Sequence, residues 1–430
     1  MEASSGRDAA MTTRDGAQGV SAAEALAEGD FGRVVHVLFR HGARGPSLNA
    51  CKALGGGPVA SSWAEEELEE LTPHGLDQCE ALGRFFGEAL AAKGFGKDTK
   101  SEVSSDVDNE GRRVKVTWHS SPIDRTIASG KAFLKGMARA GVITDEDGEI
   151  AADNDPDASS VHYGVDSDEG GARDEEMVHK LFPEPEPVDQ HDSMMLYRGF
   201  VEVPEYTEAV AKMRRGEEFG EAGKDAKNKL ERVKPSLTDL FDSWAARINI
   251  TTYLEEIMDC EAAREPGKPR PLTELNSPEV RRDVEELAHW CWSKRFFQVE
   301  EAKSLAAPLY AYIQSTFAAA AAAENGGSEG PSSTDEETPN KTSMDKDSFQ
   351  DVVPNEGNGS VAPLHIYVHS VHDYSILLLL QQLGLSEYPD GPTLGYGGYL
   401  VLGSSGKQIL NCRPFSGRDL SVSTQHSTSI

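Results

Sequence analysis

The chain lacks the features of a secreted disulfide scaffold and of a membrane-spanning protein. Its 430 residues include only five cysteines, an odd number with no CxxC or metal-ligand spacing, which favours reduced thiols over a disulfide framework. There is no run of about 18 apolar residues, the length needed to cross a bilayer. Residues 1–30 contain no apolar stretch typical of a secretory signal. We therefore expect a soluble, cytoplasmic protein with no integral membrane segment, unless the start of translation lies further upstream.

Positive charge is also scarce. The 42 Lys and Arg residues face 72 Asp and Glu residues, giving a net charge of −30. This balance argues against a partner such as nucleic acid or an anionic membrane, which would require a broad basic surface. Much of the excess lies in residues 145–177 and 320–360, which are poor in apolar side chains and rich in Asp, Glu, Ser and Gly. We expect both segments to be disordered insertions.

The remaining sequence alternates strand and helix patterns. Apolar, partly β-branched runs are followed each time by residues with helical spacing; the runs are 33–39, 113–121 and 364–373, and the helices are 71–94, 124–141 and the segment after 373. Thr72 and Pro73 are typical of the N-cap and first position of a helix. The pattern indicates an α/β fold with a mostly parallel sheet flanked by helices, in which ligands bind beyond the carboxyl ends of the strands.

This pattern divides the chain into segments. We expect a disordered segment at 1–30, an α/β core of 31–144 and 361–420, an acidic insertion at 145–177, an inserted helical cap at 178–319 and a low-complexity insertion at 320–360. The end of the core, with its turn at Ser404 to Lys407, reads as a β-hairpin.

Cationic and acid–base side chains follow each of the three strands. Arg40, His41 and Arg44 follow the first, Arg125 the second, and His372 with Asp373 the third. Arginine presents a forked, permanently charged donor set that suits phosphate oxygens, and histidine can be an uncharged nucleophile near neutral pH. Each cluster taken alone has an alternative interpretation, because its residues could be surface cations or the N-cap of a helix. Their common position predicts that they converge on one anion site.

The same residues resemble the histidine acid phosphatase family, branch two of the histidine phosphatase superfamily. Four motifs carry the resemblance in family order: RHGxRxP at Arg40 to Pro46, LTPxGxxQxxxLG at Leu71 to Gly83, a serine-to-glycine motif at Ser120 to Gly136 in which Gly130 replaces the usual Ala, and HD at His372 and Asp373 before Leu383 and Gly384.

The resemblance implies a phosphoglycerate-mutase-like core and hydrolysis of phosphate monoesters through a phosphohistidine. It implies His41 as nucleophile, Asp373 as proton donor, a phosphate pocket of Arg40, Arg44, Arg125 and His372, and no metal or cofactor. Because the proton donor must be protonated to act, the resemblance also implies an acidic optimum.

Several alternatives remain open. The mutase-like first branch also uses RHG, but its acid is a glutamate in the first half of the chain, whereas here the acid lies in the late HD. A catalytically silent interaction protein is a further reading. An inositol polyphosphate substrate would need extra cations, for which the candidates are Arg198, Lys212, Arg214, Arg215 and Lys294. A lysophosphatidic acid substrate would need an apolar trough, which the segment HWCWSKRFF could line, although we expect ordinary helix packing there. We favour broad phosphomonoester hydrolysis.

Overall fold

The computed structural model describes residues 31–53, 62–96, 113–143, 203–230, 250–274, 277–325, 363–385, 394–406 and 408–411. The strands are β1 (Val34–Arg40), β2 (Val114–Ser120), β3 (Leu364–Val371), β4 (Tyr399–Gly403) and β5 (Gln408–Asn411). The helices are α2 (Leu48–Ala53), the 3₁₀ turn η1 (Glu65–Glu67), α4 (Pro73–Ala92), α5 (Asp124–Arg139), α8 (Pro204–Arg214), α9 (Glu217–Leu230), α11 (Ile250–Ala262), α12 (Pro271–Glu274), α13 (Pro278–Phe296), α14 (Ala302–Asn325) and α15 (Asp373–Gln382).

The five strands form one mixed sheet of order β2-β3-β1-β4-β5. β1 and β2 both pair in parallel with β3, whereas β4 pairs antiparallel with β1 and with β5. The three strands predicted from the sequence are confirmed, and so is the terminal hairpin. Because β1, β2 and β3 point the same way, the polar residues that follow them reach the same edge of the sheet.

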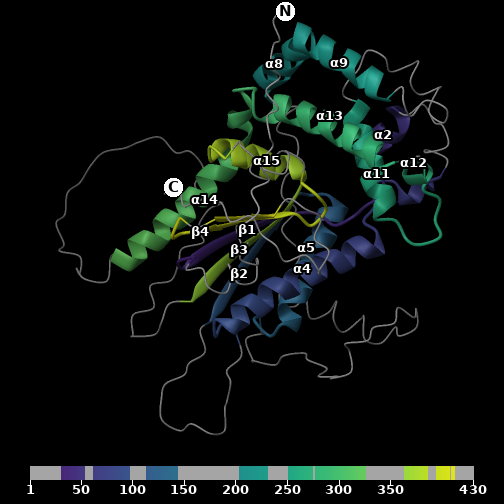
Figure 1. Ribbon diagram of the computed structural model, residues 1–430. Coiled ribbons are helices and arrows are strands. Elements are labelled where there is room, and N and C mark those ends of the chain that lie inside the picture. Colours follow the sequence, from purple (N-terminus) through teal and green to yellow (C-terminus); the bar gives the residue numbers. More distant parts are fainter. Residues whose placement is uncertain are drawn as a thin grey trace, which may run out of the picture.

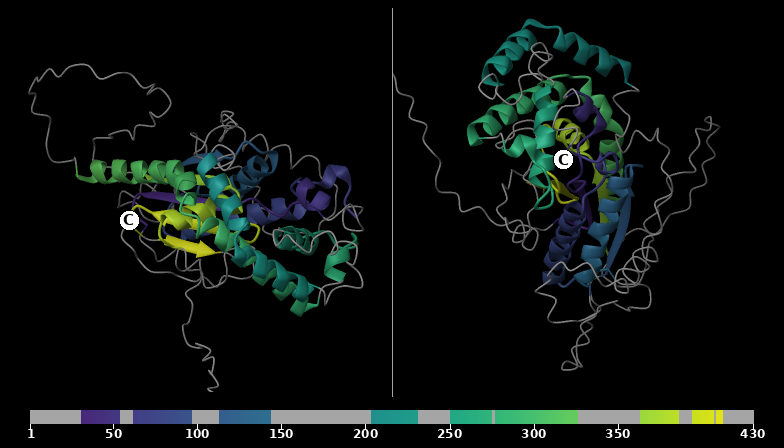
Figure 2. Two further views of the ribbon diagram at one scale, coloured as in Figure 1. Left: turned by 90° about the horizontal axis from the view of Figure 1, so that it is seen from above. Right: turned by 90° about the vertical axis from the view of Figure 1, so that its right-hand side faces the viewer.

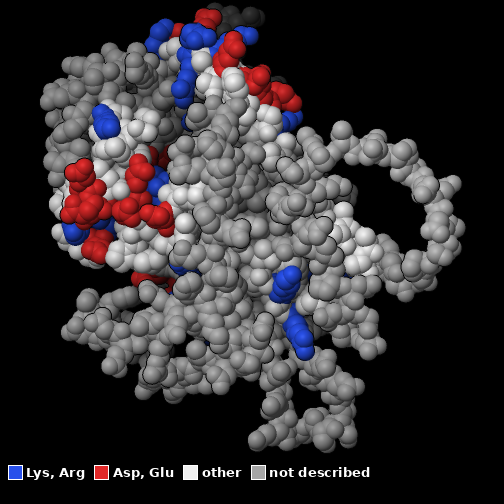
Figure 3. All heavy atoms as spheres, turned by 180° about the vertical axis from the view of Figure 1, so that it is seen from behind, with Lys and Arg blue, Asp and Glu red and all other residues white. Residues whose placement is uncertain are grey.

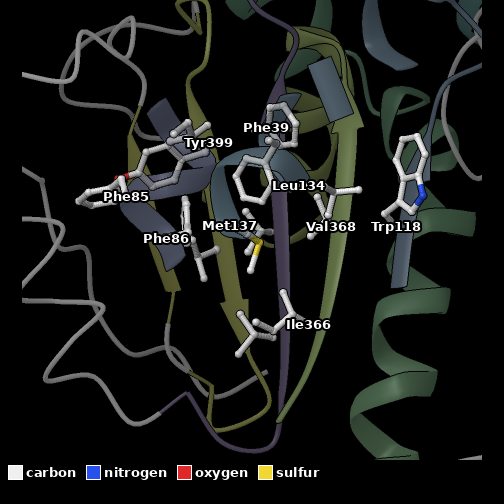
Figure 4. Close-up of a cluster of buried hydrophobic side chains, with 14 of the residues drawn as sticks. Phe39, Phe85, Phe86, Trp118, Leu134, Met137, Ile366, Val368 and Tyr399 are labelled. Carbon is white, nitrogen blue, oxygen red and sulfur yellow. The ribbon is translucent and has the colours of Figure 1, made fainter. Parts of the chain in front are cut away.

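Helices cover both faces of this sheet (Figure 1). Alternate residues of the strands, such as Phe39, Val368 and Trp118, pack against α4 and α5 in one core (Figure 4). The intervening residues, such as Leu38 and Val371, pack against α14 and α15 in a second core. Strands buried on both faces explain the near-continuous apolar runs in the sequence, and the predicted α/β class is confirmed.

The second face also carries a stack of histidines, of which His36 and His369 are buried and His119 is half-buried. His36, His119 and His369 lie side by side with Tyr367, with ring centroids 4.6 Å apart for His36 and Tyr367 and 5.1 Å apart for His119 and His369. Burial affects the pKa values of His36 and His369, because both residues are 0% exposed. Burial first, and then the neighbouring His119 and His365, lowers the pKa of His36 to about 3.

The remaining helices lie beyond the carboxyl ends of the parallel strands. In Figure 1 and in the right-hand view of Figure 2, α8, α9, α11 and α13 gather on one side of the sheet, opposite α4 and α5. In the part of the chain that the structure describes, no helix is long and apolar enough to span a membrane. On the face shown in Figure 3, Lys and Arg of the described residues are interspersed with Asp and Glu.

Two expected segment boundaries differ from the structure. α14 packs mainly against α15 and β1, because its apolar side chains complete the second core, to which α8 and α13 also contribute. It also continues to Asn325, since a run of alanines favours helix, so a low-complexity segment starting at residue 320 is wrong for its first residues. The expected segments 1–30 and 145–177, and most of 320–360, lie outside the described residues.

Candidate active site

A pocket of about 240 Å³ opens at the carboxyl ends of β1 and β3. All six residues singled out in the sequence line it: Arg40, His41, Arg44, Arg125, His372 and Asp373. They come from the end of β1 and its following loop, the first turn of α5 and the start of α15. Segments more than 300 residues apart in the chain therefore meet at one place, as the parallel strands predicted.

The loop after β1 lies against the start of α4. A Cβ at Gly42 would come within 2.1 Å of the Gly75 carbonyl oxygen, and a Cβ at Gly75 would lie equally close to the Ala43 carbonyl oxygen. Each glycine is therefore required by backbone contact. Thr72 is the N-cap of α4, as predicted; its hydroxyl accepts from the Gly75 N–H at 3.1 Å and donates to the Ala43 carbonyl oxygen at 2.9 Å.

Gln78 fixes the same loop from the next turn of α4. Its side-chain oxygen accepts from the Ala43 N–H at 3.2 Å, and its amide nitrogen donates to the Tyr396 carbonyl oxygen at 3.0 Å. The LTPxGxxQ motif thus holds the loop that carries His41 in place through these hydrogen bonds and backbone contacts. The sequence analysis explained only its helix-starting residues, because the partners of Gly75 and Gln78 become visible only in three dimensions.

The His41 ring has a defined orientation. Its Nδ1 lies 2.8 Å from the Gly42 carbonyl oxygen, and because a carbonyl only accepts, Nδ1 carries the hydrogen. In the neutral ring the lone pair is then on Nε2. Burial, followed by the charges of His372 and Arg44, lowers the pKa of His41 well below its ordinary value, so the ring is neutral and nucleophilic near neutral pH.

His372 has a comparable environment on the opposite strand. It is the N-cap residue of α15 and is 3% exposed. Its ring lies 5.4 Å from that of His41, at 75°. Burial, then the charges of Arg125 and Arg44, lowers the pKa of His372 well below its ordinary value.

Each of the three arginines singled out in the sequence contacts a carboxylate. The pairs are Arg40 with Asp373 at 3.1 Å, Arg44 with Glu256 at 2.9 Å and Arg125 with Glu69 at 3.5 Å. Burial alone would lower the pKa of Arg40 and Arg44, but the partner carboxylates outweigh it and raise both. Arg40 and Arg44 therefore stay charged inside the protein.

Arg40 and Arg44 each carry a donor that has no acceptor among the described residues. The Nε groups of Arg40 and Arg44 are buried and make no hydrogen bond there. Buried donors are usually satisfied, so these two N–H groups suit an acceptor that enters the pocket. The Tyr396 ring packs against the Arg40 guanidinium, with the ring centroid 4.2 Å from Arg40 Cζ.

The outer part of the pocket is formed by the helices beyond the strand ends. Of the five cations considered for a polyphosphate site, only Arg214 lines the pocket; Lys294 pairs with Glu218, and Arg198 lies outside the described residues. Arg295, which the sequence analysis did not single out, also lines it and donates from Nε to the Tyr206 hydroxyl at 3.1 Å.

The aromatic segment HWCWSKRFF is divided between two environments. Trp292 lines the pocket, whereas Phe296 is 1% exposed in the second core and Trp290 packs against Phe219. The expectation of ordinary helix packing therefore holds for much of the segment, and Trp292 gives the pocket one aromatic wall.

The sequence analysis did not predict that three acidic residues of one helix line the pocket. Glu255, Glu256 and Asp259 of α11 line the pocket opposite the arginines. Burial raises the pKa of both Glu255 and Asp259. Their signal in the sequence is an ordinary amphipathic helix, and only the packing of α11 shows which face meets the pocket.

Comparison with known proteins agrees with the motifs. The family model of the histidine phosphatase superfamily (branch 2) matches residues 33–184. No curated protein matches the chain. Similar solved structures include a phytase from Citrobacter braakii, at 17% identity and TM-score 0.47, covering 89% of this chain and 84% of that one.

Two further structures are similar. Hafnia alvei phytase has 16% identity and TM-score 0.49, covering 88% of this chain and 83% of that chain. The multiple inositol polyphosphate phosphatase of Bifidobacterium longum has 12% identity and TM-score 0.45, covering 93% of this chain and 88% of that chain. The resemblance found in the sequence is thus confirmed over residues 33–184, which carry the pattern of the histidine phosphatase superfamily, branch 2.

Proposed function

We propose that the protein hydrolyses phosphate monoesters through a phosphohistidine intermediate on His41. The observation that carries the proposal is a neutral, oriented histidine beside three arginines, of which Arg40 and Arg44 are buried and each carry an N–H group without an acceptor among the described residues. Nucleophile and cations together match the needs of phosphoryl transfer, in which charge spreads over the equatorial oxygens.

In the first step, the Nε2 lone pair of His41 attacks phosphorus and the bond to the ester oxygen breaks. The hydrogen bond from Nδ1 to the Gly42 carbonyl stabilises the positive charge that develops on the ring. Arg40, Arg44 and Arg125 neutralise the phosphoryl oxygens with His372. Asp373 gives its proton to the leaving alkoxide.

In the second step, water attacks phosphorus and the nitrogen–phosphorus bond breaks. The Asp373 carboxylate takes a proton from that water, which regenerates the acid for the next cycle, and inorganic phosphate leaves. The three arginines supply the positive charge throughout, so the proposed cycle needs no metal ion or cofactor.

The charge of the pocket favours a singly phosphorylated substrate. Its lining includes five arginines, of which Arg214 and Arg295 are the outer two, and four carboxylates, three of them on α11. With Asp373 protonated, as the proposed mechanism requires, the five arginines exceed the three remaining carboxylates by two positive charges, which suits one phosphate better than several. An inositol polyphosphate remains the alternative within the same chemistry, since the outer arginines would contact a second phosphate.

The first test is hydrolysis of p-nitrophenyl phosphate between pH 4 and 8 with EDTA present. The wild type should be active, His41→Ala inactive, and His74→Ala, an exposed histidine on α4, fully active. Quenching in alkali should trap phosphate on the wild type and not on His41→Ala. Inactivity of the wild type would instead favour a silent interaction protein. A panel of glycerol 2-phosphate and inositol hexakisphosphate then separates the two substrate classes.

A further inference from the structure

The ring of His372 is attached to a chain of two hydroxyl groups. The Ser121 hydroxyl lies 3.0 Å from His372 Nε2, and the Thr126 hydroxyl lies 2.6 Å from that of Ser121. Both hydroxyl-bearing residues are 0% exposed. Ser121 directly follows β2 and Thr126 lies in the first turn of α5, so the chain links the second strand unit to the third.

The direction of every hydrogen bond in this chain follows from its last member. The Thr126 hydroxyl lies 2.8 Å from the carbonyl oxygens of both Ser121 and Ile123. Carbonyl oxygens only accept, so the single hydroxyl hydrogen of Thr126 is directed to them. Thr126 must then accept from the Ser121 hydroxyl, because two oxygens 2.6 Å apart with no hydrogen between them would repel each other.

This uses the only hydrogen of Ser121, whose oxygen can therefore only accept from His372. We propose that Thr126 and Ser121 are positioning residues that hold the His372 proton on Nε2. The lone pair of the neutral ring then lies on Nδ1. The opposite arrangement, with Ser121 donating to the ring, would leave the contact between the two hydroxyls without a hydrogen.

The arrangement matters for the phosphate pocket, and here the inference rests on the proposed function. A neutral His372 with its lone pair on Nδ1 can accept the proton of a singly protonated phosphate ester, whose second pKa is about 6. The ring becomes a cation when the anion arrives, and the Ser121 contact does not change because Nε2 donates in both states. Without these two hydroxyl groups, the neutral His372 ring could flip. The flip would exchange the positions of the two ring nitrogens and place a different nitrogen against the phosphate.

The test measures the ring nitrogens directly by NMR of protein labelled with nitrogen-15 in histidine, at a pH where the ring is neutral. His372→Asn assigns the signal. The wild type and Thr126→Ser should show the proton on Nε2. Thr126→Val keeps the size but removes the acceptor, which frees the Ser121 hydrogen to donate to His372, so a population with the proton on Nδ1 should appear.

Activity on p-nitrophenyl phosphate should follow the spectra. Thr126→Val should lower kcat/KM by about tenfold to a hundredfold, the scale expected when a binding group is displaced, and Thr126→Ser should restore it. A matched control is Thr316→Val, since the Thr316 hydroxyl lies 2.7 Å from Nε2 of the buried His36, outside the pocket. This variant should leave the His372 signal and the rate of hydrolysis unchanged.

A proton on Nδ1 of His372 in the wild type would overturn the proposal, whether or not Thr126→Val folds. A Thr126→Val protein with an unchanged His372 signal would also overturn it. Failure of the proposed function is a separate result, since it would appear as an inactive wild type with the Nε2 proton still present.

Discussion

The Asp373 carboxylate lies 3.1 Å from the Arg40 guanidinium, and its other oxygen accepts from the Tyr374 N–H at 2.7 Å. The proposed acid is therefore bound to one of the cations that would bind the phosphate. When a substrate enters, Arg40 is expected to exchange this carboxylate for a phosphoryl oxygen, which releases Asp373 toward the leaving group. In the proposed mechanism, this one ion pair would couple substrate binding to proton delivery.

Asp373→Asn removes the transferable proton but keeps a side chain of similar size. We expect kcat for an alkyl phosphate such as glycerol 2-phosphate to fall by about 10²–10⁴-fold. The loss for p-nitrophenyl phosphate should be much smaller, since p-nitrophenolate leaves without a proton. Steady-state kinetics on both esters check this, with Asp77→Asn on the exposed side of α4 as control. Equal losses on both esters would rule out Asp373 as the proton donor.

Glu256→Gln removes the carboxylate that faces Arg44. Glu256 also accepts from the Ser47 N–H at 2.7 Å, a contact that the Gln side-chain oxygen can keep. With one negative charge fewer in the pocket, inorganic phosphate should inhibit more strongly, by on the order of tenfold. The free energy of unfolding should fall by about 1–3 kcal/mol, because Arg44 is buried and loses its charged partner. Inhibition constants and urea unfolding measure the two effects.

The control for that variant is Glu300→Gln, since Glu300 is exposed at 79% of its side chain and lies outside the pocket. It should change neither quantity. Weaker phosphate binding in Glu256→Gln would mean that Glu256 positions Arg44 for the anion and does not compete with it.

The pH profile should reflect the lowered pKa of His41. A histidine with the ordinary value of 6.5 would lose its lone pair to a proton as the pH falls through 6.5, and kcat/KM would fall tenfold per pH unit below it. Because burial and the neighbouring cations lower this pKa, kcat/KM should hold or rise as the pH falls through 6.5. An acidic limb centred near 6.5 would show that His41 titrates normally.

Acid stability should depend on the histidine stack. Unfolded His36 takes up a proton below about 6.5, whereas folded His36, with a pKa of about 3, does not. Stability is therefore complete above pH 6.5 and is lost as the pH falls toward 3, by up to about 3 kcal/mol at pH 4 for this residue. The facing titratable groups are His119, His365 and His369, with Tyr312 and Tyr367.

Urea unfolding of the wild type and His36→Gln at pH 7, 5.5 and 4.5 measures this effect. The variant should be less stable at pH 7 but lose less between pH 7 and 4.5. Parallel losses in both proteins would place the acid sensitivity elsewhere.

Gly130 departs from the family pattern, and the structure gives the reason. A Cβ at Gly130 would lie 2.6 Å from Cζ3 of the Trp118 ring, so the Trp118 ring occupies the space that an alanine methyl would need. Gly130→Ala should lower the melting temperature. Combining it with Trp118→Leu should cost less than the sum of the two single changes, by about 1 kcal/mol or more, because neighbouring changes couple. Additive effects in this cycle would argue against the contact.

The extent of prediction from sequence differs between fold and site. The three strand and helix units were predictable because their apolar periodicity is local, and the convergence of His41, Arg125 and Asp373 followed from parallel strands that share one edge. The carboxylates on α11 were not predictable, because an acidic residue on an amphipathic helix has the same pattern whether it faces solvent or a pocket.

The sequence by itself determined which chemical groups gather at the pocket, namely His41, the arginines, His372 and Asp373, because their order along the chain is tied to the strand ends. The tertiary structure alone decided the partners of those groups. Which carboxylate faces each arginine, and which way the protons of His41 and His372 point, depend on contacts between residues hundreds of positions apart. Hydrogen bonds and ion pairs act over about 3 Å, and only the folded chain brings such residues that close.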